Sequence, residues 1–101
     1  MEDLPPHILK PEVHWQRAQG YLAMEMYQDA LRELRALPIE EPWEKRGQVF
    51  LLTIYQEMAN WEDAQKVARG LRYEFPEEVD WWIADAYATR RHESIIEAQS
   101  I

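Results

Sequence analysis

Histidines and carboxylates are the residues of this sequence that could bind a metal or transfer protons, but their spacing supports neither role. His7, His14 and His92 are isolated, and none pairs with a second ligand on one helix face, as in the H-E-x-x-H pattern. Acidic residues gather within residues 40–44 and 77–80, where we expect helices to begin. Helix dipoles and capping explain acidic residues at such positions. We therefore predict no metal site.

The sequence patterns of nucleophilic catalysis and phosphate binding are also missing. Ser94 and Ser100 have no plausible partners for a nucleophilic role, and no nucleophile elbow occurs. Gly20, Gly47 and Gly70 are too far apart to form a phosphate-binding loop. We predict that the protein is not an enzyme and needs no cofactor.

The composition is that of a globular and acidic protein. A chain of 101 residues is one domain by length, and a hydrophobic share of 47% with an aromatic share of 12% suffices for a core. The 11 basic and 19 acidic residues give a net charge of −8. This charge opposes binding to nucleic-acid phosphates and to anionic lipid surfaces. We predict neither a nucleic-acid partner nor a membrane partner.

Location is predicted from what the sequence does not contain. There is no cysteine, and therefore no disulfide framework or thiolate chemistry. The start, Met-Glu-Asp-Leu-Pro-Pro, lacks the basic and apolar regions of a signal peptide. The longest apolar runs, such as residues 49–54, are too short to cross a bilayer. We predict a cytoplasmic protein.

Apolar residues recur at helical spacing along most of the chain, and no segment alternates as a strand would. Prolines at positions 38, 42 and 76 separate the periodic segments, and Asn60 is expected to cap a helix. Each segment is short for a helix that is stable alone, so the helices must pack on one another. After an N-terminal extension over residues 1–10 we predict six helices, over residues 11–26, 27–37, 43–58, 61–73, about 77–91 and 93–101.

Identical residues recur 34 positions apart, which indicates one supersecondary unit repeated and stacked. Short connections between the predicted helices make successive helices antiparallel neighbours. The predicted fold is therefore all-α, built from stacked helical hairpins. The matching pairs are Tyr21/Tyr55, Met24/Met58, Asp29/Asp63, Ala30/Ala64, Leu37/Leu71 and Pro42/Pro76.

With this period and pairing, the chain resembles tetratricopeptide repeat (TPR) proteins, and residues 81–98 resemble a segment of small bacterial members without an assigned activity. The resemblance implies a superhelix, or solenoid, of about 2.5 repeats over residues 11–42, 43–76 and 77–101, the last one incomplete. The second repeat matches the family pattern best, through Leu51, Tyr55, Ala64, Ala68, Leu71 and Pro76.

Two departures from the family pattern affect the expected packing. Leu52 stands at the small-residue position of the second repeat, where the first repeat has Ala18, so the close helix contact must adjust around it. Arg17 and Asp85 stand where the family has leucine, which is unusual for positions in a core.

The resemblance implies a non-catalytic scaffold that binds a peptide or a helix of a partner protein in a concave groove lined by the first helix of each repeat. An acidic group of the partner could bind near Arg90 and Arg91, because arginine holds a carboxylate at two points. The alternative for individual residues is that the aromatic ones pack on neighbouring helices and the arginines are merely solvated. The groove positions carried over are Trp15, Gln19, Arg46, Thr53, Gln56, Tyr87, Arg90 and Arg91.

The last predicted helix suggests a second function, self-association. A solenoid end requires a polar cap, whereas the last predicted helix is expected to bring Ile95 and Ile96 beside Trp81 and Trp82 at this end. Either the array continues in a longer protein, or a second copy or a partner covers the end. In the second case the protein forms a homodimer through its C-terminal helix.

Overall fold

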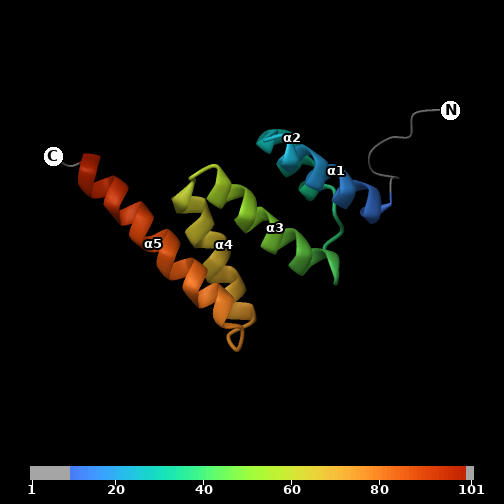
Figure 1. Cartoon of the computed structure of the whole chain (residues 1–101). Helices are drawn as coiled ribbons and strands as arrows, with labels where there is room; N and C mark the ends of the chain where they lie inside the picture. The colour runs from blue at the N-terminus through green and yellow to red at the C-terminus, as the bar shows by residue number, and fades with distance from the viewer. Residues whose placement is uncertain (1–9, 100–101) are drawn as a thin grey trace. The chain divides into compact units, whose positions relative to one another are not determined.

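The part of the chain that the structure describes is predominantly helical. This computed structural model describes residues 10–99, and no strand occurs among them, which confirms the predicted all-α class. Most of the predicted N-terminal extension and His7 lie outside the described residues, as do residues 100–101. The helices are α1 (Pro11–Ala23), α2 (Tyr27–Arg35), α3 (Trp43–Glu57), α4 (Trp61–Glu74) and α5 (Val79–Gln99) (Figure 1).

Helix α5 corrects the prediction of six helices. The predicted break near residues 91–93 is wrong, because α5 is continuous from Val79 to Gln99. No proline or glycine follows Pro76 in the sequence, and a break would leave backbone N–H and C=O groups at two new helix ends to be satisfied. Glu93 and Ser94 could have capped a new helix but are equally accommodated inside one. Residues 10–99 therefore form five helices, without a third hairpin.

The 34-residue period reappears in the backbone at the two hairpin turns, between α1 and α2 and between α3 and α4. Glu25 and Ala59 both adopt a positive φ, 58° and 57°. In each turn the N–H of the following residue donates to a tyrosine carbonyl, that of Tyr21 at 2.8 Å and that of Tyr55 at 2.9 Å. These are the features of a Schellman helix ending. The period thus repeats a turn geometry as well as residue types.

The predicted cap of α4 is confirmed. The Asp63 N–H donates to the side-chain oxygen of Asn60 at 3.3 Å, and the Asn60 amide donates to the Asp63 carboxylate at 2.8 Å. This reciprocal pair satisfies one of the N–H groups that a helix start leaves unpaired.

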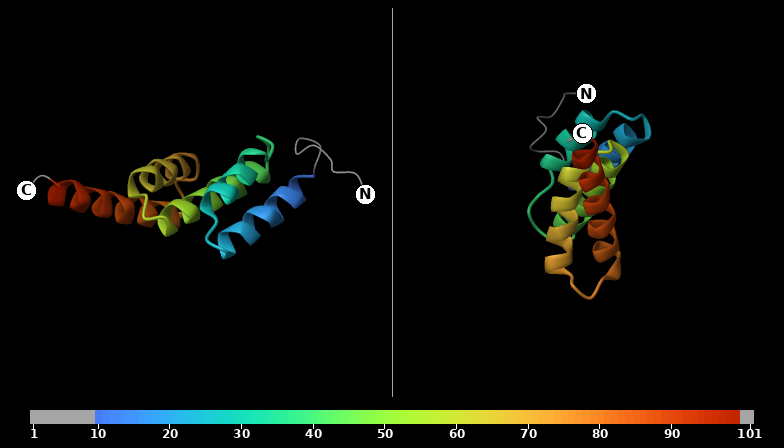
Figure 2. Two further views of the ribbon diagram at one scale, coloured as in Figure 1. Left: turned by 90° about the horizontal axis from the view of Figure 1, so that it is seen from above. Right: turned by 90° about the vertical axis from the view of Figure 1, so that its left-hand side faces the viewer.

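The chain divides into two compact units, one extending to Gly47 and the other beginning at Gln48, within α3. In the first unit, α1 and α2 pack closely and run in opposite directions (Figure 2). Ala18, Ala30 and Leu31 are buried. Small residues at positions 18 and 30 allow the two helix backbones to approach each other.

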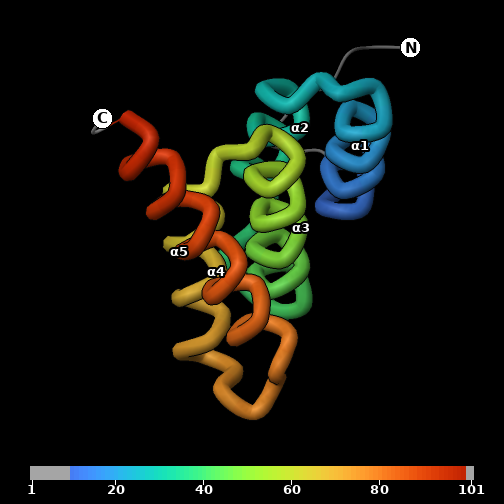
Figure 3. The backbone as a smooth tube through the Cα atoms, turned by 60° about the vertical axis from the view of Figure 1, so that its left-hand side comes forward, coloured from blue at the N-terminus to red at the C-terminus, as the bar shows by residue number. Residues whose placement is uncertain are grey.

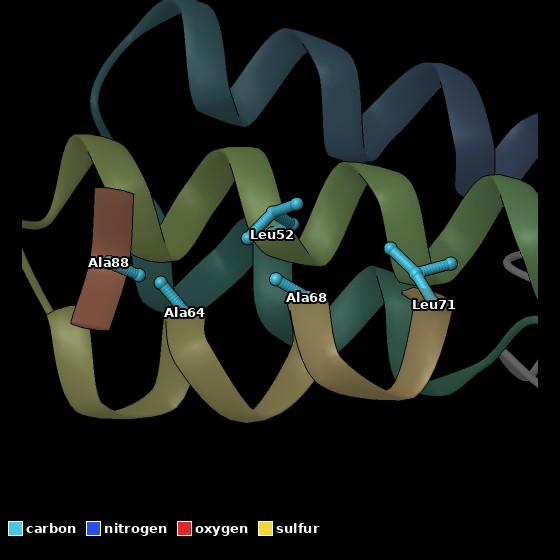
Figure 4. Close-up of a cluster of buried hydrophobic side chains, with 5 residues drawn as sticks. All are labelled: Leu52, Ala64, Ala68, Leu71 and Ala88. Atoms are coloured by element: carbon cyan, nitrogen blue, oxygen red, sulfur yellow. The ribbon is translucent and has the colours of Figure 1, made fainter. Parts of the chain in front are cut away.

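In the second unit, α4 and α5 are the closely paired helices, and they lie side by side in Figure 3. Leu52 of α3 completes a buried cluster with residues of both helices (Figure 4). Alanine dominates the surfaces of α4 and α5 that meet, whereas α3 contributes a leucine. The backbones of α3 and α4 approach each other less closely than those of α1 and α2, as expected for the larger residue at this position. The cluster consists of Leu52, Ala64, Ala68, Leu71 and Ala88.

Candidate protein-interaction surface

Helix α5 has a buried side and an exposed side, and both follow from its helical repeat of about 100° per residue. The buried side consists of Trp81, Ala84, Asp85 and Ala88, which contribute to or border the core of the second unit. The opposite side is exposed, with 63% of Val79, 62% of Ile83 and 47% of Tyr87 accessible to solvent. We call this exposed side the α5 outer face. It comprises Val79, Ile83, Ala86, Tyr87 and Arg90, at the spacing i, i+4, i+7, i+8 and i+11.

An aromatic and arginine cluster lies at the edge of the α5 outer face. The rings of Trp61 and Tyr87 meet edge to face, with centroids 5.4 Å apart and planes at 67°. The Arg91 guanidinium lies 5.1 Å from the Tyr87 ring centroid and 6.0 Å from that of Trp61. Its Nη2 and Nε donate to the Tyr87 hydroxyl at 2.8 and 3.2 Å. We call these three residues the Trp61 cluster.

A second cluster of the same kind lies in the first unit. The rings of Trp15 and Trp43 are 6.4 Å apart, centroid to centroid, at 58°. The Arg46 guanidinium lies 5.2 Å from the Trp43 ring centroid. The structure thus brings Trp15 and Arg46, two of the predicted groove residues, together through a tryptophan that the groove prediction did not include.

The remaining groove residues have different environments. Gln19 and Arg90 are exposed, and Gln56 is half-buried. Thr53 is half-buried and donates to the carbonyl of Val49 at 3.3 Å, a bond within its own helix. Trp15, Gln19 and Arg46 belong to the first unit and the other predicted groove residues to the second. A groove shared by all of them stays a prediction.

The residues predicted for self-association do not lie together, because the continuous α5 separates Trp81 and Trp82 from Ile95 and Ile96 by about four helical turns. Trp81 is half-buried beside the core and donates to Glu78 at 2.8 Å. Trp82 is 45% exposed, donates to the Pro76 carbonyl at 2.9 Å, and lies under the guanidinium of Arg72, 4.1 Å from its ring centroid. Ile95 and Ile96, on the last turns of α5, are 43% and 48% exposed.

Asp85 is buried, with only 3% of its surface exposed, and it joins α4 to α5 by ionic hydrogen bonds. Arg72 donates to one carboxylate oxygen at 2.8 Å, and Arg69 donates to the other at 3.3 Å. Thr89 donates to the carboxylate at 3.1 Å, and Gln65 donates to the Thr89 hydroxyl at 2.6 Å. These partners explain how a carboxylate occupies a core position of the repeat.

Arg17, the other charged residue at a position where the TPR pattern has leucine, avoids the core. Its side chain is 51% exposed, and its guanidinium lies 4.0 Å from the Glu33 carboxylate. The same carboxylate contacts Nδ1 of His14 at 2.9 Å. His14 is 2% exposed and is therefore a packed helix histidine.

Two further observations concern residues 10–99 only. No three histidine, aspartate or glutamate side chains among them come together as a metal ion would require. None of the helices there combines the length and the hydropathy needed to cross a membrane.

Comparisons of the chain with protein-family models, with curated proteins and with solved structures gave no match. The resemblance to TPR proteins therefore stays a prediction based on the period and on the residues at its positions.

Proposed function

We propose that this protein is a non-catalytic interaction module with TPR-like repeats, which binds a helix or an extended peptide of a partner protein through the α5 outer face. The supporting observation is the row of exposed side chains at positions 79, 83 and 87 on one helix side. Exposed apolar side chains that gather on one side of a helix favour an interaction site. The surface overlaps the predicted groove at Tyr87 and Arg90.

The residue types of the surface fit this function. Tyrosine, tryptophan and arginine are the residues that most often contribute strongly to binding energy in interfaces. Tyr87 and Arg91 already contact each other and Trp61, so binding costs them little rotamer entropy. The apolar area of Val79 and Ile83 adds a hydrophobic contribution when a partner removes it from water, and the entropic cost of association offsets part of that contribution.

The test begins with a displayed library of random peptides selected on the immobilised full chain. Peptides selected in this way are expected to bind the Ile83→Glu variant at least about tenfold more weakly, since a carboxylate would be buried in the apolar contact. The measurement is fluorescence anisotropy with labelled selected peptides. Ile39→Glu is the matched control, because Ile39 is 89% exposed and lies outside α5. Failure to select any peptide over the blank support contradicts the proposal.

Self-association through the end of α5 is the second candidate function. Trp61, the first residue of α4, is level with Tyr87 and Arg91 of α5, and the last turns of α5 continue past it (Figure 1). Ile95 and Ile96 follow Ala88 by seven and eight positions, so they continue the side of α5 that packs on α4. A second copy could cover them.

If this second function holds, the weight-average mass of the chain rises with concentration in sedimentation velocity experiments. Ile96→Glu is expected to abolish the rise, because it places a charge in the contact, while Ile39→Glu leaves it unchanged. A mass that stays that of a monomer at all concentrations, or that rises equally in both variants, excludes the dimer.

A further inference from the structure

Arg90 and Arg91 differ from five of the 11 Lys and Arg side chains of this acidic chain, because no carboxylate of the described residues lies close to them. Within residues 10–99, no Asp or Glu oxygen lies within 4.0 Å of either guanidinium. Glu93 is only three residues after Arg90 on the same helix, at a spacing that permits an ion pair. Cationic side chains that do have a carboxylate within this distance are Arg17, Arg32, Lys66, Arg69 and Arg72.

Arg91 is held in place by aromatic groups instead. Two of its nitrogens donate to the Tyr87 hydroxyl, and its plane lies near the rings of Tyr87 and Trp61. Its third nitrogen, Nη1, has no hydrogen-bond partner in the described part of the chain. A guanidinium that is already ordered and still has donors to offer is suited to bind a carboxylate with little loss of entropy.

The two arginines also stand at one end of the α5 outer face. Val79 and Ile83 form the apolar end, and Tyr87 separates them from Arg90 on the same helix side. A ligand that covers the whole face contacts the apolar side chains of Val79 and Ile83 at one end. It contacts the positive charge of Arg90 about two turns beyond Ile83. The chain's net charge of −8 disfavours a ligand with many negative charges. A ligand with one or two carboxylates next to an apolar stripe matches the order of side chains on this face, and it has few enough negative charges to approach an acidic chain.

We infer that the ligand of the α5 outer face is an amphipathic peptide segment of a partner protein with an Asp or Glu at one end of its apolar stripe, bound by Arg90 and Arg91. This inference rests on the proposed function and names the chemistry of its partner.

The experiment compares three forms of the full chain in selections from one displayed library of random peptides. These are the unmodified chain, the Arg90→Gln/Arg91→Gln variant, and the control Arg32→Gln/Arg35→Gln, which changes the net charge equally on exposed positions of α2. Peptides selected on the unmodified chain and on the control are expected to be enriched in Asp or Glu at one end of an apolar stripe. This enrichment disappears on Arg90→Gln/Arg91→Gln.

Binding constants supply a second readout. A synthetic peptide selected on the unmodified chain is expected to lose about tenfold in affinity when its acidic residue becomes Gln, and about as much on the Arg90→Gln/Arg91→Gln variant. The two losses are not additive, because they remove the same contact. Selected peptides without acidic enrichment, or with equal enrichment on all three forms, overturn the inference and leave the proposed function standing. A selection that yields no peptide at all overturns both.

Discussion

The Arg69→Met/Arg72→Met double variant is expected to unfold at a free energy about 3 kcal/mol lower than that of the unmodified chain. Both arginines donate to the carboxylate of Asp85, which is 3% exposed. Removal of the partners of a buried charge costs about 3–5 kcal/mol. The lower end of this range applies, because Thr89 still donates to Asp85 and because the arginine side chains are themselves 58% and 39% exposed.

The measurement is urea unfolding followed by circular dichroism. We expect the loss of unfolding free energy to arise because the buried Asp85 carboxylate has no cationic partner, and not from the absence of the arginines themselves. Asp85→Leu in the double variant should therefore restore most of the stability. Asp85→Leu alone should change stability less, since Arg69 and Arg72 can turn towards solvent. Arg32→Met/Arg35→Met, on exposed positions, is the control. Equal effects of the two double variants would show that the Asp85 network does not stabilise the fold.

The 34-residue period is matched by a repeated turn geometry, which neighbouring residues encode, although the predicted helix over residues 11–26 extended through the first of these turns. Glu25 and Ala59 adopt the same left-handed conformation within 1° of φ, from 58° to 57°. Asn60 caps α4 through its own side chain, as its residue type predicts, whereas Met26 at the equivalent position of α2 makes no side-chain cap. Such features depend on a few consecutive residues, so a sequence pattern can indicate them.

The length of α5 and the burial of Asp85 could not be read in the same way. Glu93 and Ser94 are compatible with a helix start and with a helix interior, so the choice depends on what surrounds the chain. Asp85 is tolerable in a core only because α4 places Arg69 and Arg72 opposite it. That juxtaposition requires the packing of two helices, which residue types alone do not specify.

The candidate surface was predicted in part. Tyr87 and Arg91 were identified from the groove positions of the repeat, and the structure brings these two together. Trp61 was interpreted only as the start of a helix, although its ring completes the cluster. An aromatic residue at a helix start does not show which helix it contacts: Trp43, the first residue of α3, contacts Trp15 of α1.

The sequence and the structure lead to opposite expectations for Leu52. By the repeat pattern this position takes a small residue, so Leu52→Ala should let α3 approach α4 and cost little. In the structure Leu52 is 3% exposed and completes the core of the second unit (Figure 4). We therefore expect Leu52→Ala to lower the free energy of unfolding by about 2–5 kcal/mol, through lost burial and the cavity that remains. Leu51→Ala, at a half-buried neighbouring position, should cost less.

The reciprocal change at the equivalent position of the first repeat is Ala18→Leu. It tests further whether the repeat pattern or the observed packing determines which residue is favoured at this position. Ala18 is fully buried where α1 and α2 pack closely, so three added carbon atoms should cost about 1–3 kcal/mol by overpacking. Urea unfolding of both variants provides the measurement. If the spacing of each hairpin is set by the residue at this position, both exchanges destabilise, because each helix pair is fitted to its own side chain. If Leu52→Ala is neutral while Ala18→Leu destabilises, both hairpins prefer the small residue of the repeat, and the wider spacing around Leu52 does not contribute to stability.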